Sequence, residues 1–237
     1  MKLDKLKIKI FADGAEIDSI KKLNSNSFIK GFTTNPSLMK KAGIKNYKDF
    51  ALKLLSEITD KPISFEVFSD EILEMEKQAY EISKWGKNVN VKIPVTNTKK
   101  ESTTELIRKL SSKGIICNVT ALFTNDQIKE VYDAIHNSTP SILSIFAGRI
   151  ADTGIDPSDI IKYSVDLVKS KPKTEVLWAS TRETLNIFQA EKLGCQIITV
   201  PHGILSKLNY LDKNLDEFSL ETVKSFYKDS IAAGFKI

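Results

Sequence analysis

A short run of β-forming residues followed by a segment of helical periodicity recurs eight times, and this repetition constrains the fold more than any other feature. The runs are Lys7–Ala12, Phe28–Thr33, Pro62–Val67, Val89–Ile93, Ile115–Val119, Ser141–Phe146, Glu175–Ala179 and Gln196–Val200. The helical segments include Tyr47–Ile58, Glu71–Trp85, Lys100–Leu110, Asp126–Ile135, Pro157–Val168 and Arg182–Leu193. Such repetition predicts a parallel sheet, and eight units are the number at which the sheet can close. We therefore predict an α/β fold, a (β/α)8 TIM barrel.

The same pattern predicts a single domain over residues 1–237, because no low-complexity linker divides the chain. An open, doubly wound sheet is the alternative, but no G-x-G-x-x-G or P-loop pattern follows the first strand. After the last strand, residues 218–237 are predicted to form an additional C-terminal helix. Its helically spaced residues are Leu220, Val223, Phe226, Tyr227, Ser230 and Ile231. Such a helix needs an apolar surface to cover, on its own barrel or on a neighbouring one.

The composition is that of an ordinary globular protein, with 41% hydrophobic residues and a formal net charge of +5. Lysines alternate with acidic residues and no nucleic-acid-binding motif is found, so a small anionic substrate is expected and a nucleic-acid partner is not. Cys117 and Cys195 lack paired spacing, which favours reduced thiols in a cytoplasmic protein. No leader and no long apolar run is found, so no membrane partner is expected.

Lys92 lies in an apolar, strand-like run from Val89 to Val95. Side chains alternate between the faces of a strand, so Lys92 shares with Asn90 the face opposite the valines. If that face is enclosed, loss of water disfavours the ammonium ion and favours the amine, a nucleophile that can condense with a carbonyl group. The alternative is a solvated lysine on an edge strand. The neighbouring strands must distinguish the two.

Almost every predicted strand ends in a polar residue. Asp13 follows the first strand and Glu66 ends the third, while the set also contains Thr33, Thr34, Asn35, Asn118, Thr120, Ser144, Arg149, Ser180 and Arg182. In a parallel barrel the carboxyl ends of all strands meet at one mouth, so these side chains should surround one ligand together with Lys92. Two carboxylates beside a lysine can supply the proton transfers of imine formation. Two arginines with a hydroxyl group can hold a phosphate.

Other chemistries have less support in the sequence. His136 and His202 are the only histidines, and no group of acidic residues, histidines and cysteines has metal-ligand spacing. We expect His202, at the end of the last strand, to have a structural or solvent-contact role. No serine lies in a G-x-S-x-G motif, which argues against a serine hydrolase.

These residues resemble those of the transaldolase family, in particular its short members, which include the fructose 6-phosphate aldolases. The most specific motifs are TTNPSL at Thr33–Leu38, VKIPVT at Val91–Thr96, FAGRIAD at Phe146–Asp152 and WASTRE at Trp178–Glu183. The resemblance runs from about Lys7 to Pro201. It implies a barrel that forms a Schiff base with its substrate and needs neither a cofactor nor a metal.

The resemblance also implies roles for four residues. Lys92 corresponds to the lysine that attacks the keto carbon of a ketose phosphate. Glu66 and Thr120 resemble the pair that moves protons through a water while the carbinolamine dehydrates. Asp13 is similar to the base that deprotonates the C4 hydroxyl group, so that the C3–C4 bond breaks. Gly14 is a departure, because many members have a hydroxyl residue at this position.

The remaining site residues are assigned by the same resemblance to substrate binding. The three-carbon dihydroxyacetone unit would be held by Asn35, Asn118 and Ser144, with Thr33 beside them. The phosphate would be held by Arg149, Ser180 and Arg182. Glu66 and Phe146 are similar to the transaldolase branch, whereas fructose 6-phosphate aldolases have glutamine and tyrosine there. Phenylalanine cannot donate a proton to the enamine, so transfer is expected rather than release of dihydroxyacetone.

Several alternatives stay open at this point. A fructose 6-phosphate aldolase and a transaldolase acting on sulfo-sugars are the nearest, because two arginines also suit a sulfonate. A barrel that binds sugar phosphates without turnover is an alternative of a different class. The resemblance also implies a homo-oligomer, since short members often form pentamers or decamers by exchanging a C-terminal helix.

Overall fold

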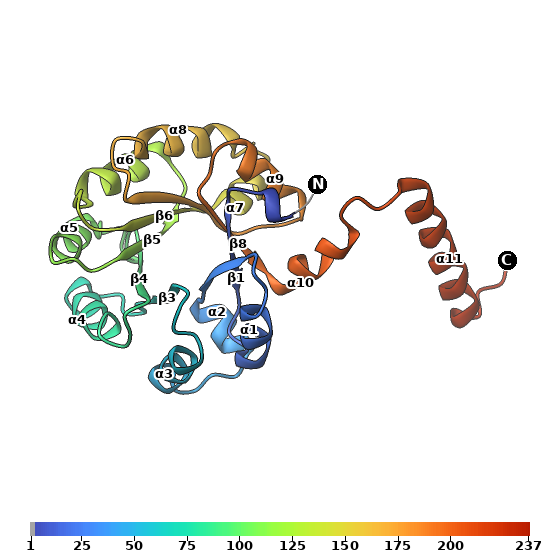
Figure 1. Cartoon of the computed structure of the whole chain (residues 1–237), viewed down its shortest axis with the longest axis horizontal. Coiled ribbons are helices and arrows are strands. Elements are labelled where there is room, and N and C mark those ends of the chain that lie inside the picture. The colour runs from blue at the N-terminus through green and yellow to red at the C-terminus, as the bar shows by residue number, and fades with distance from the viewer. Residues whose placement is uncertain (1–2) are drawn as a thin grey trace.

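The computed structural model describes residues 3–237 and confirms the predicted fold, a closed barrel of eight parallel strands paired in chain order. The strands are β1 (Lys9–Asp13), β2 (Ile29–Thr33), β3 (Ile63–Glu66), β4 (Val89–Pro94), β5 (Cys117–Leu122), β6 (Ser141–Ile145), β7 (Thr174–Trp178) and β8 (Ile197–Pro201). β1 pairs with β8 and so closes the ring. The helices surround this ring, and the last one stands away from it (Figure 1).

The α-helices are α1 (Ile17–Asn24), α2 (Pro36–Lys41), α3 (Tyr47–Glu57), α4 (Ile72–Ile82), α5 (Thr104–Ser112), α6 (Asn125–Ala134), α7 (Ala147–Asp152), α8 (Ser158–Val168), α9 (Leu185–Lys192), α10 (His202–Leu205) and α11 (Leu215–Ala233), with 3-10 turns η1 (Leu3–Lys5) and η2 (Ser206–Tyr210). Each predicted helix is present, with shifted ends. The prediction that one begins at Lys100 was wrong. Lys100 has a φ of 65° in a loop closed by a bridge between Thr96 and Ser102, so α5 begins only at Thr104.

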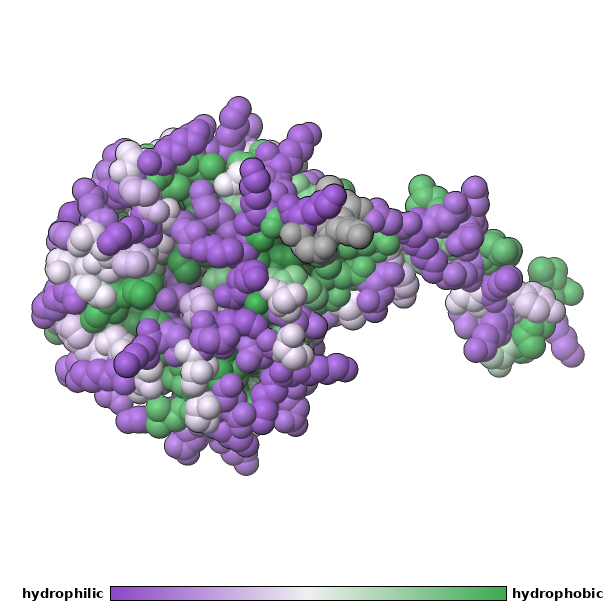
Figure 2. Space-filling view, viewed as in Figure 1, coloured by the Kyte–Doolittle hydropathy of each residue, from purple (hydrophilic) through white to green (hydrophobic). Residues whose placement is uncertain are grey.

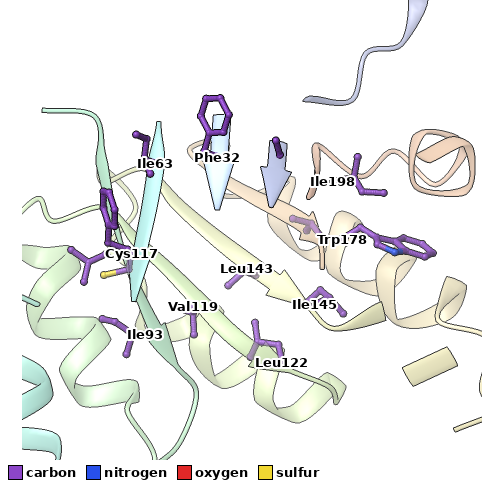
Figure 3. Close-up of a cluster of buried hydrophobic side chains, with 14 of the residues drawn as sticks. Phe32, Ile63, Ile93, Cys117, Val119, Leu122, Leu143, Ile145, Trp178 and Ile198 are labelled. Atoms are coloured by element: carbon purple, nitrogen blue, oxygen red, sulfur yellow. The ribbon is translucent and has the colours of Figure 1, made fainter. Parts of the chain in front are cut away.

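The larger part of the core lies between the barrel and its helices. Outward-facing strand residues such as Ile63, Val119 and Trp178 are buried there (Figure 3). Because successive strand residues point to opposite faces, the alternate residues of the same strands point into the barrel. This alternation sends apolar side chains to the helices and leaves the inner positions near the carboxyl ends for polar ones.

A second apolar cluster fills the barrel interior. It consists of Phe11, Ile142, Leu177, Ala179 and Ile197, from β1, β6, β7 and β8 and the residue that follows β7. Gly31 of β2 gives Phe11 its space, because a Cβ atom at Gly31 would lie 2.6 Å from the phenylalanine ring. Side chains therefore fill this part of the barrel interior, as in other barrels of this type. We expect a ligand to enter from the carboxyl ends of the strands, where the polar residues lie.

Helix α11 begins at Leu215 and ends at Ala233, rather than spanning residues 218–237 as predicted. Asn214 accepts hydrogen bonds from the backbone of Asp216 and Glu217, and Gly234 ends the helix with a φ of 67°. No residue of α11 is buried. Its apolar side chains are exposed on an arm that projects from the barrel (Figure 2).

Across residues 3–237, no helix combines the length and the apolar character that crossing a membrane would require. Cys117 and Cys195 are both buried and unbonded to each other. Burial raises the pKa of each thiol to about 12, so both stay protonated and unreactive at neutral pH.

Candidate active site

One cavity of about 490 Å³ opens at the carboxyl ends of the strands. The residues given roles from the sequence line it, namely Asp13, Thr33, Asn35, Glu66, Lys92, Asn118, Thr120, Ser144, Phe146, Arg149, Ser180 and Arg182. Thr34 was also expected there but does not line the cavity, because its side chain is buried and donates a 2.9 Å hydrogen bond to the carbonyl oxygen of Ser64. A larger hollow of about 750 Å³ lies where β7 and β8 begin, but the lysines that line it, Lys162, Lys169 and Lys192, are exposed to solvent, unlike Lys92. The residues chosen from the sequence therefore meet at one place, while their roles stay predictions.

Lys92 lies in the wall of this cavity and is only 8% exposed, so the enclosed face was predicted correctly and the wet-edge alternative does not apply. Its Nζ atom is 3.0 Å from Glu66 Oε2 and donates a 3.2 Å hydrogen bond to the carbonyl oxygen of Thr34. Glu66 lies opposite Lys92 in the β3–β4 register. The sequence predicted two carboxylates near Lys92, and the structure shows that Glu66 is in direct contact with it and can take the proton of the ammonium group.

Asp13 lies at the end of β1, and one of its oxygens accepts a 2.7 Å hydrogen bond from Thr33 Oγ1. The Thr33 hydroxyl is also 2.5 Å from the hydroxyl of Thr199 on β8, a neighbour that the sequence did not predict. Burial raises the pKa of Asp13, although the positive charge of Lys92 opposes this effect. A carboxyl group with a raised pKa suits the transfer of a proton to and from a substrate hydroxyl.

A chain of polar contacts crosses the floor of the cavity. Asn118 donates a 3.0 Å hydrogen bond to Ser64 and accepts a 2.6 Å bond from the Ser144 hydroxyl. These bonds fix the orientation of the Asn118 amide. Thr120 is two residues further along β5, and its buried hydroxyl oxygen has no hydrogen-bond partner within residues 3–237. A buried hydroxyl of this kind can serve a ligand or a water.

The two arginines lie on the rim of the cavity, Arg149 in α7 and Arg182 in the loop between β7 and α9. Gly148 allows α7 to approach this loop closely, because a Cβ atom there would lie 1.6 Å from the carbonyl oxygen of Ser180. Ser180 has a φ of 65°, a conformation that is strained for a side-chain-bearing residue. Arg149 lies over the Phe146 ring, 5.7 Å from its centre. Only a glycine at position 148 permits this close approach, which brings Arg149 near Ser180 and Arg182.

Asn35 has a local role as well as its place in the cavity lining. Its side chain accepts a 2.9 Å hydrogen bond from the backbone of Leu38 and so caps α2. Phe146 packs against Phe123 with ring centres 5.6 Å apart. The contact closes one side of the cavity with an apolar surface.

His202, which the sequence placed at the end of β8, lies behind Asp13. Its Nε2 atom is buried without a hydrogen-bond partner in the described chain and would be 2.9 Å from a Cβ atom at Gly14. Burial lowers the pKa of His202, with the carboxylates of Glu16 and Asp13 opposing this. The imidazole therefore occupies the space that a side chain at position 14 would need, and it is neutral at neutral pH.

In residues 3–237, no three acidic, histidine or cysteine side chains are grouped so that they could hold a metal ion. The cations of the site are its own lysine and arginines. Lys92 directly contacts one carboxylate and one backbone carbonyl oxygen, and the cavity lining adds the carboxyl group of Asp13, two asparagine amides and hydroxyl groups.

Comparison with known proteins agrees with this geometry. The family model described as "Transaldolase/Fructose-6-phosphate aldolase" matches residues 10–237. The chain belongs to this family. A protein of Nitrosopumilus maritimus (strain SCM1) named "Probable transaldolase" is 36% identical over 224 residues, which are 94% of each chain. A protein of Thermoanaerobacter sp. (strain X514) with the same name is 35% identical over 97% of this chain and 100% of its own.

Solved structures that resemble the chain share its fold at low sequence identity. The crystal structure of 2,3-dimethylmalate lyase, a PEP mutase/isocitrate lyase superfamily member, has a TM-score of 0.58 and 11% identity, covering 98% of this chain and 86% of that one. This likeness shows the barrel alone. The transaldolase/fructose-6-phosphate aldolase family membership rests on the sequence matches.

Sequence reasoning missed several residues that support the family site. The hydroxyl of Tyr47 donates a 2.9 Å hydrogen bond to the backbone carbonyl oxygen of Glu66, and Ser64 fixes Asn118. Asp152 pairs with Arg182. Asp152 lies within the FAGRIAD motif, which was the available signal, whereas nothing local links Tyr47 to Glu66 across 19 residues.

Proposed function

We propose that this protein is a transaldolase, which transfers a dihydroxyacetone unit from a ketose phosphate to an aldose phosphate through a Schiff base on Lys92. The observation that carries the proposal is the buried Lys92, with Glu66 at 3.0 Å, in the same cavity as a second, separately held carboxyl group, Asp13. Binding alone needs neither the amine nor two acids. This argues against the alternative of a sugar-phosphate-binding barrel without turnover.

The first chemical step is formation of the imine. Glu66 accepts a proton from the Lys92 ammonium group, and the resulting amine attacks the keto carbon of the substrate. The carbinolamine then loses water, for which Glu66 can return the proton to the departing hydroxyl group. The unpartnered Thr120 hydroxyl lines the same cavity and is available to orient a water in this exchange.

The second step is cleavage of the carbon–carbon bond. Asp13 removes the proton of the C4 hydroxyl group, the C3–C4 bond breaks, and its electrons move to the protonated imine to give an enamine. The aldose leaves, and the three-carbon unit stays on Lys92. Asn118 and Ser144, joined by a 2.6 Å hydrogen bond, are placed to hold its hydroxyl groups. An acceptor aldehyde then reverses these steps with Asp13 as the acid.

Transfer is favoured over release by the residues that face the enamine. Phe146 offers no proton, and its ring packs against Phe123. Release of dihydroxyacetone, as in a fructose 6-phosphate aldolase, requires protonation of the enamine. Supplying fructose 6-phosphate without an acceptor separates the two. Steady production of free dihydroxyacetone would favour the aldolase.

The direct test of the mechanism is reductive trapping. The protein is incubated with fructose 6-phosphate and borohydride, and the modified residue is located by mass spectrometry. A three-carbon adduct on Lys92 is expected. An adduct on another lysine, or tight binding of ketose phosphates with neither adduct nor turnover, would contradict the proposal.

The substrates are proposed to be sedoheptulose 7-phosphate and fructose 6-phosphate as donors, as in the pentose phosphate pathway. Arg149, Arg182 and Ser180 line the rim where the terminal anion would bind. A sulfonate could bind there too, and a panel of ketose phosphates and sulfonates would rank the donors. Two buried, unbonded thiols are consistent with the proposed cytoplasmic location.

We also propose that the protein is a homo-oligomer, of the size of a pentamer or decamer, in which α11 packs on a neighbouring copy. No residue of α11 is buried, and Phe226 and Ile231 are 69% and 65% exposed. A helix that exposes apolar residues in a row lacks its packing surface. Light scattering of the full chain tests the assembly.

A further inference from the structure

Asp152 is the last residue of α7 and binds Arg182 with both carboxylate oxygens. Arg182 Nε donates to Oδ1 at 3.0 Å and Arg182 Nη2 donates to Oδ2 at 2.5 Å. A bidentate pair of this geometry fixes the plane of the guanidinium group. Because the pair with Asp152 uses Nε and Nη2 of Arg182, Nη1 is available to donate to a ligand.

The stability of α7 does not explain this aspartate. A negative charge at the carboxyl end of a helix is unfavourable, because the helix dipole is negative there. The only side-chain hydrogen bonds of Asp152 in residues 3–237 go to Arg182, and about half of each side chain is exposed. An exposed pair of this kind adds little to the stability of a fold. The pair instead fixes the orientation of Arg182, a residue that lines the active-site cavity.

The pair also changes the charge of the anion site. The pKa of Asp152 is lowered, first by its hydrogen bond with Arg182 and also by Arg149, so the carboxylate is ionised at neutral pH. Arg149, Arg182 and Asp152 together carry one net positive charge, whereas the two arginines alone would carry two. A phosphate monoester carries about −1.5 to −2 at pH 7, and a sulfonate carries a single charge.

We propose that Asp152 is a positioning and specificity residue: it orients Arg182 toward the head group and reduces the preference of the site for doubly charged head groups over singly charged ones. The proposal rests on the proposed function, since it takes Arg149 and Arg182 as the anion site of that reaction. It adds a residue that discriminates substrates by head-group charge without touching the reacting atoms.

The test compares Asp152→Asn with the wild-type protein. Asparagine keeps the shape of the side chain and removes its charge. For each protein, kcat/KM is measured at pH 8 with fructose 6-phosphate and with the analogous ketose 6-sulfonate. In Asp152→Asn, the ratio of kcat/KM for the phosphate to kcat/KM for the sulfonate is expected to rise about three- to fivefold, as expected for an interaction between partly exposed charges. Asp152→Glu, which retains the charge, should keep the ratio near that of the wild type.

Asp156→Asn is the matched control. Asp156 carries the same charge four residues further along, and its carboxylate accepts from the backbone of Ser158. The ratio should not move in this variant. If the ratio rises equally in Asp152→Asn and Asp156→Asn, the effect comes from the net charge of the protein and not from the contact with Arg182, and the proposal is wrong. If kcat/KM falls by the same factor for both substrates in Asp152→Asn, the proposed charge selection is likewise wrong.

The failure of the proposed function gives a different result. Calorimetry with methyl phosphate and methanesulfonate measures the same charge preference without turnover, and trapping on Lys92 is followed in parallel. An unchanged preference with an intact Lys92 adduct would overturn the role of Asp152 alone. A changed preference without any Lys92 adduct would support Asp152 and overturn the proposed reaction.

Discussion

The cavity and helix α11 depart from the usual distribution of residues in opposite directions. In the cavity Lys92 is 8% exposed and the side chain of Glu66 beside it is 16% exposed, although charged groups normally stay in water. On α11, Phe226 and Ile231 are more than half exposed, although such residues normally lie inside. Each departure is unfavourable for the stability of the folded chain taken alone.

The difference shows which process each region serves. Most buried polar groups in the cavity are held by neighbours in the same chain, as Lys92 is by Glu66 and Asn118 by Ser64 and Ser144, while the Thr120 hydroxyl is left for a ligand or a water. On α11, Phe218 packs on Tyr210 with ring centres 5.4 Å apart, but no residue of the helix is buried, and we propose that a neighbouring copy covers the rest of its apolar face. Substitutions in the cavity should therefore change chemistry, and substitutions on α11 should change assembly.

The largest effect on turnover is expected for Lys92→Met, which keeps the length of the side chain and removes the nucleophile. Turnover should fall by at least about three orders of magnitude, with the far-ultraviolet circular dichroism of the barrel retained. A coupled assay with fructose 6-phosphate and erythrose 4-phosphate measures it. Lys87→Met, just before β4 and exposed, is the control. Activity in Lys92→Met close to that of this control would contradict the mechanism.

Asp13→Asn should slow cleavage by about 10²- to 10⁴-fold, while borohydride still traps the uncleaved six-carbon fructose 6-phosphate on Lys92. Because burial raises the pKa of Asp13 in the folded chain, its stabilising contribution is present at low pH and is lost as pH rises through that pKa. The variant should therefore gain stability relative to the wild type as pH increases from acid to neutral. Urea unfolding at several pH values measures this, and the opposite trend would show that the pKa is lowered.

Gly148→Ala should reduce turnover by about one to two orders of magnitude, because a 1.6 Å contact with the Ser180 carbonyl must be relieved by moving α7, which carries Arg149, or the loop that carries Arg182. We expect a loss of about 1–3 kcal/mol in the free energy of unfolding, the usual range for overpacking. Gly203→Ala is the control, since no atom lies within 4 Å of a Cβ there. Equal stability of the two variants would argue against the close approach.

Gly14→Ala should lower turnover about tenfold by displacing His202 and shifting the end of β1 that carries Asp13. His202→Ala removes the ring that obstructs the new methyl group. The two substitutions together should then lose less than the product of the single effects, which a double-mutant cycle measures. Independent effects would mean that the contact between positions 14 and 202 does not position Asp13.

The smallest effect within one chain is expected for Phe226→Asp combined with Ile231→Asp. The free energy of unfolding of the barrel should change by no more than about 0.5 kcal/mol, as for other surface substitutions, while the oligomer dissociates in sedimentation. Ser225→Asp, on the opposite face of α11, should leave the oligomer intact. Dissociation in both, or in neither, would contradict packing through the apolar face.

Much of the fold was predictable because it depends on local periodicity. Alternation along a strand and helical spacing between strands are properties of short segments, so the eight units and eleven of the cavity residues could be chosen from the sequence, whereas Phe146 was chosen from the family resemblance. Boundaries were less accurate. The start of α5 depends on the loop at Lys100, whose left-handed conformation is held by contacts between Thr96 and Ser102.

The sequence by itself determined the closed parallel barrel, the inward face of Lys92 and the polar residues at the strand ends. Only the tertiary structure decided that Glu66 is the partner of Lys92, that Asp152 holds Arg182, that His202 fills the space beside Gly14, and that α11 leaves its own barrel. The physical reason is the distance along the chain over which each property is determined. Which face a side chain takes depends on its nearest neighbours in the chain, whereas which side chains meet depends on the register and closure of the whole sheet.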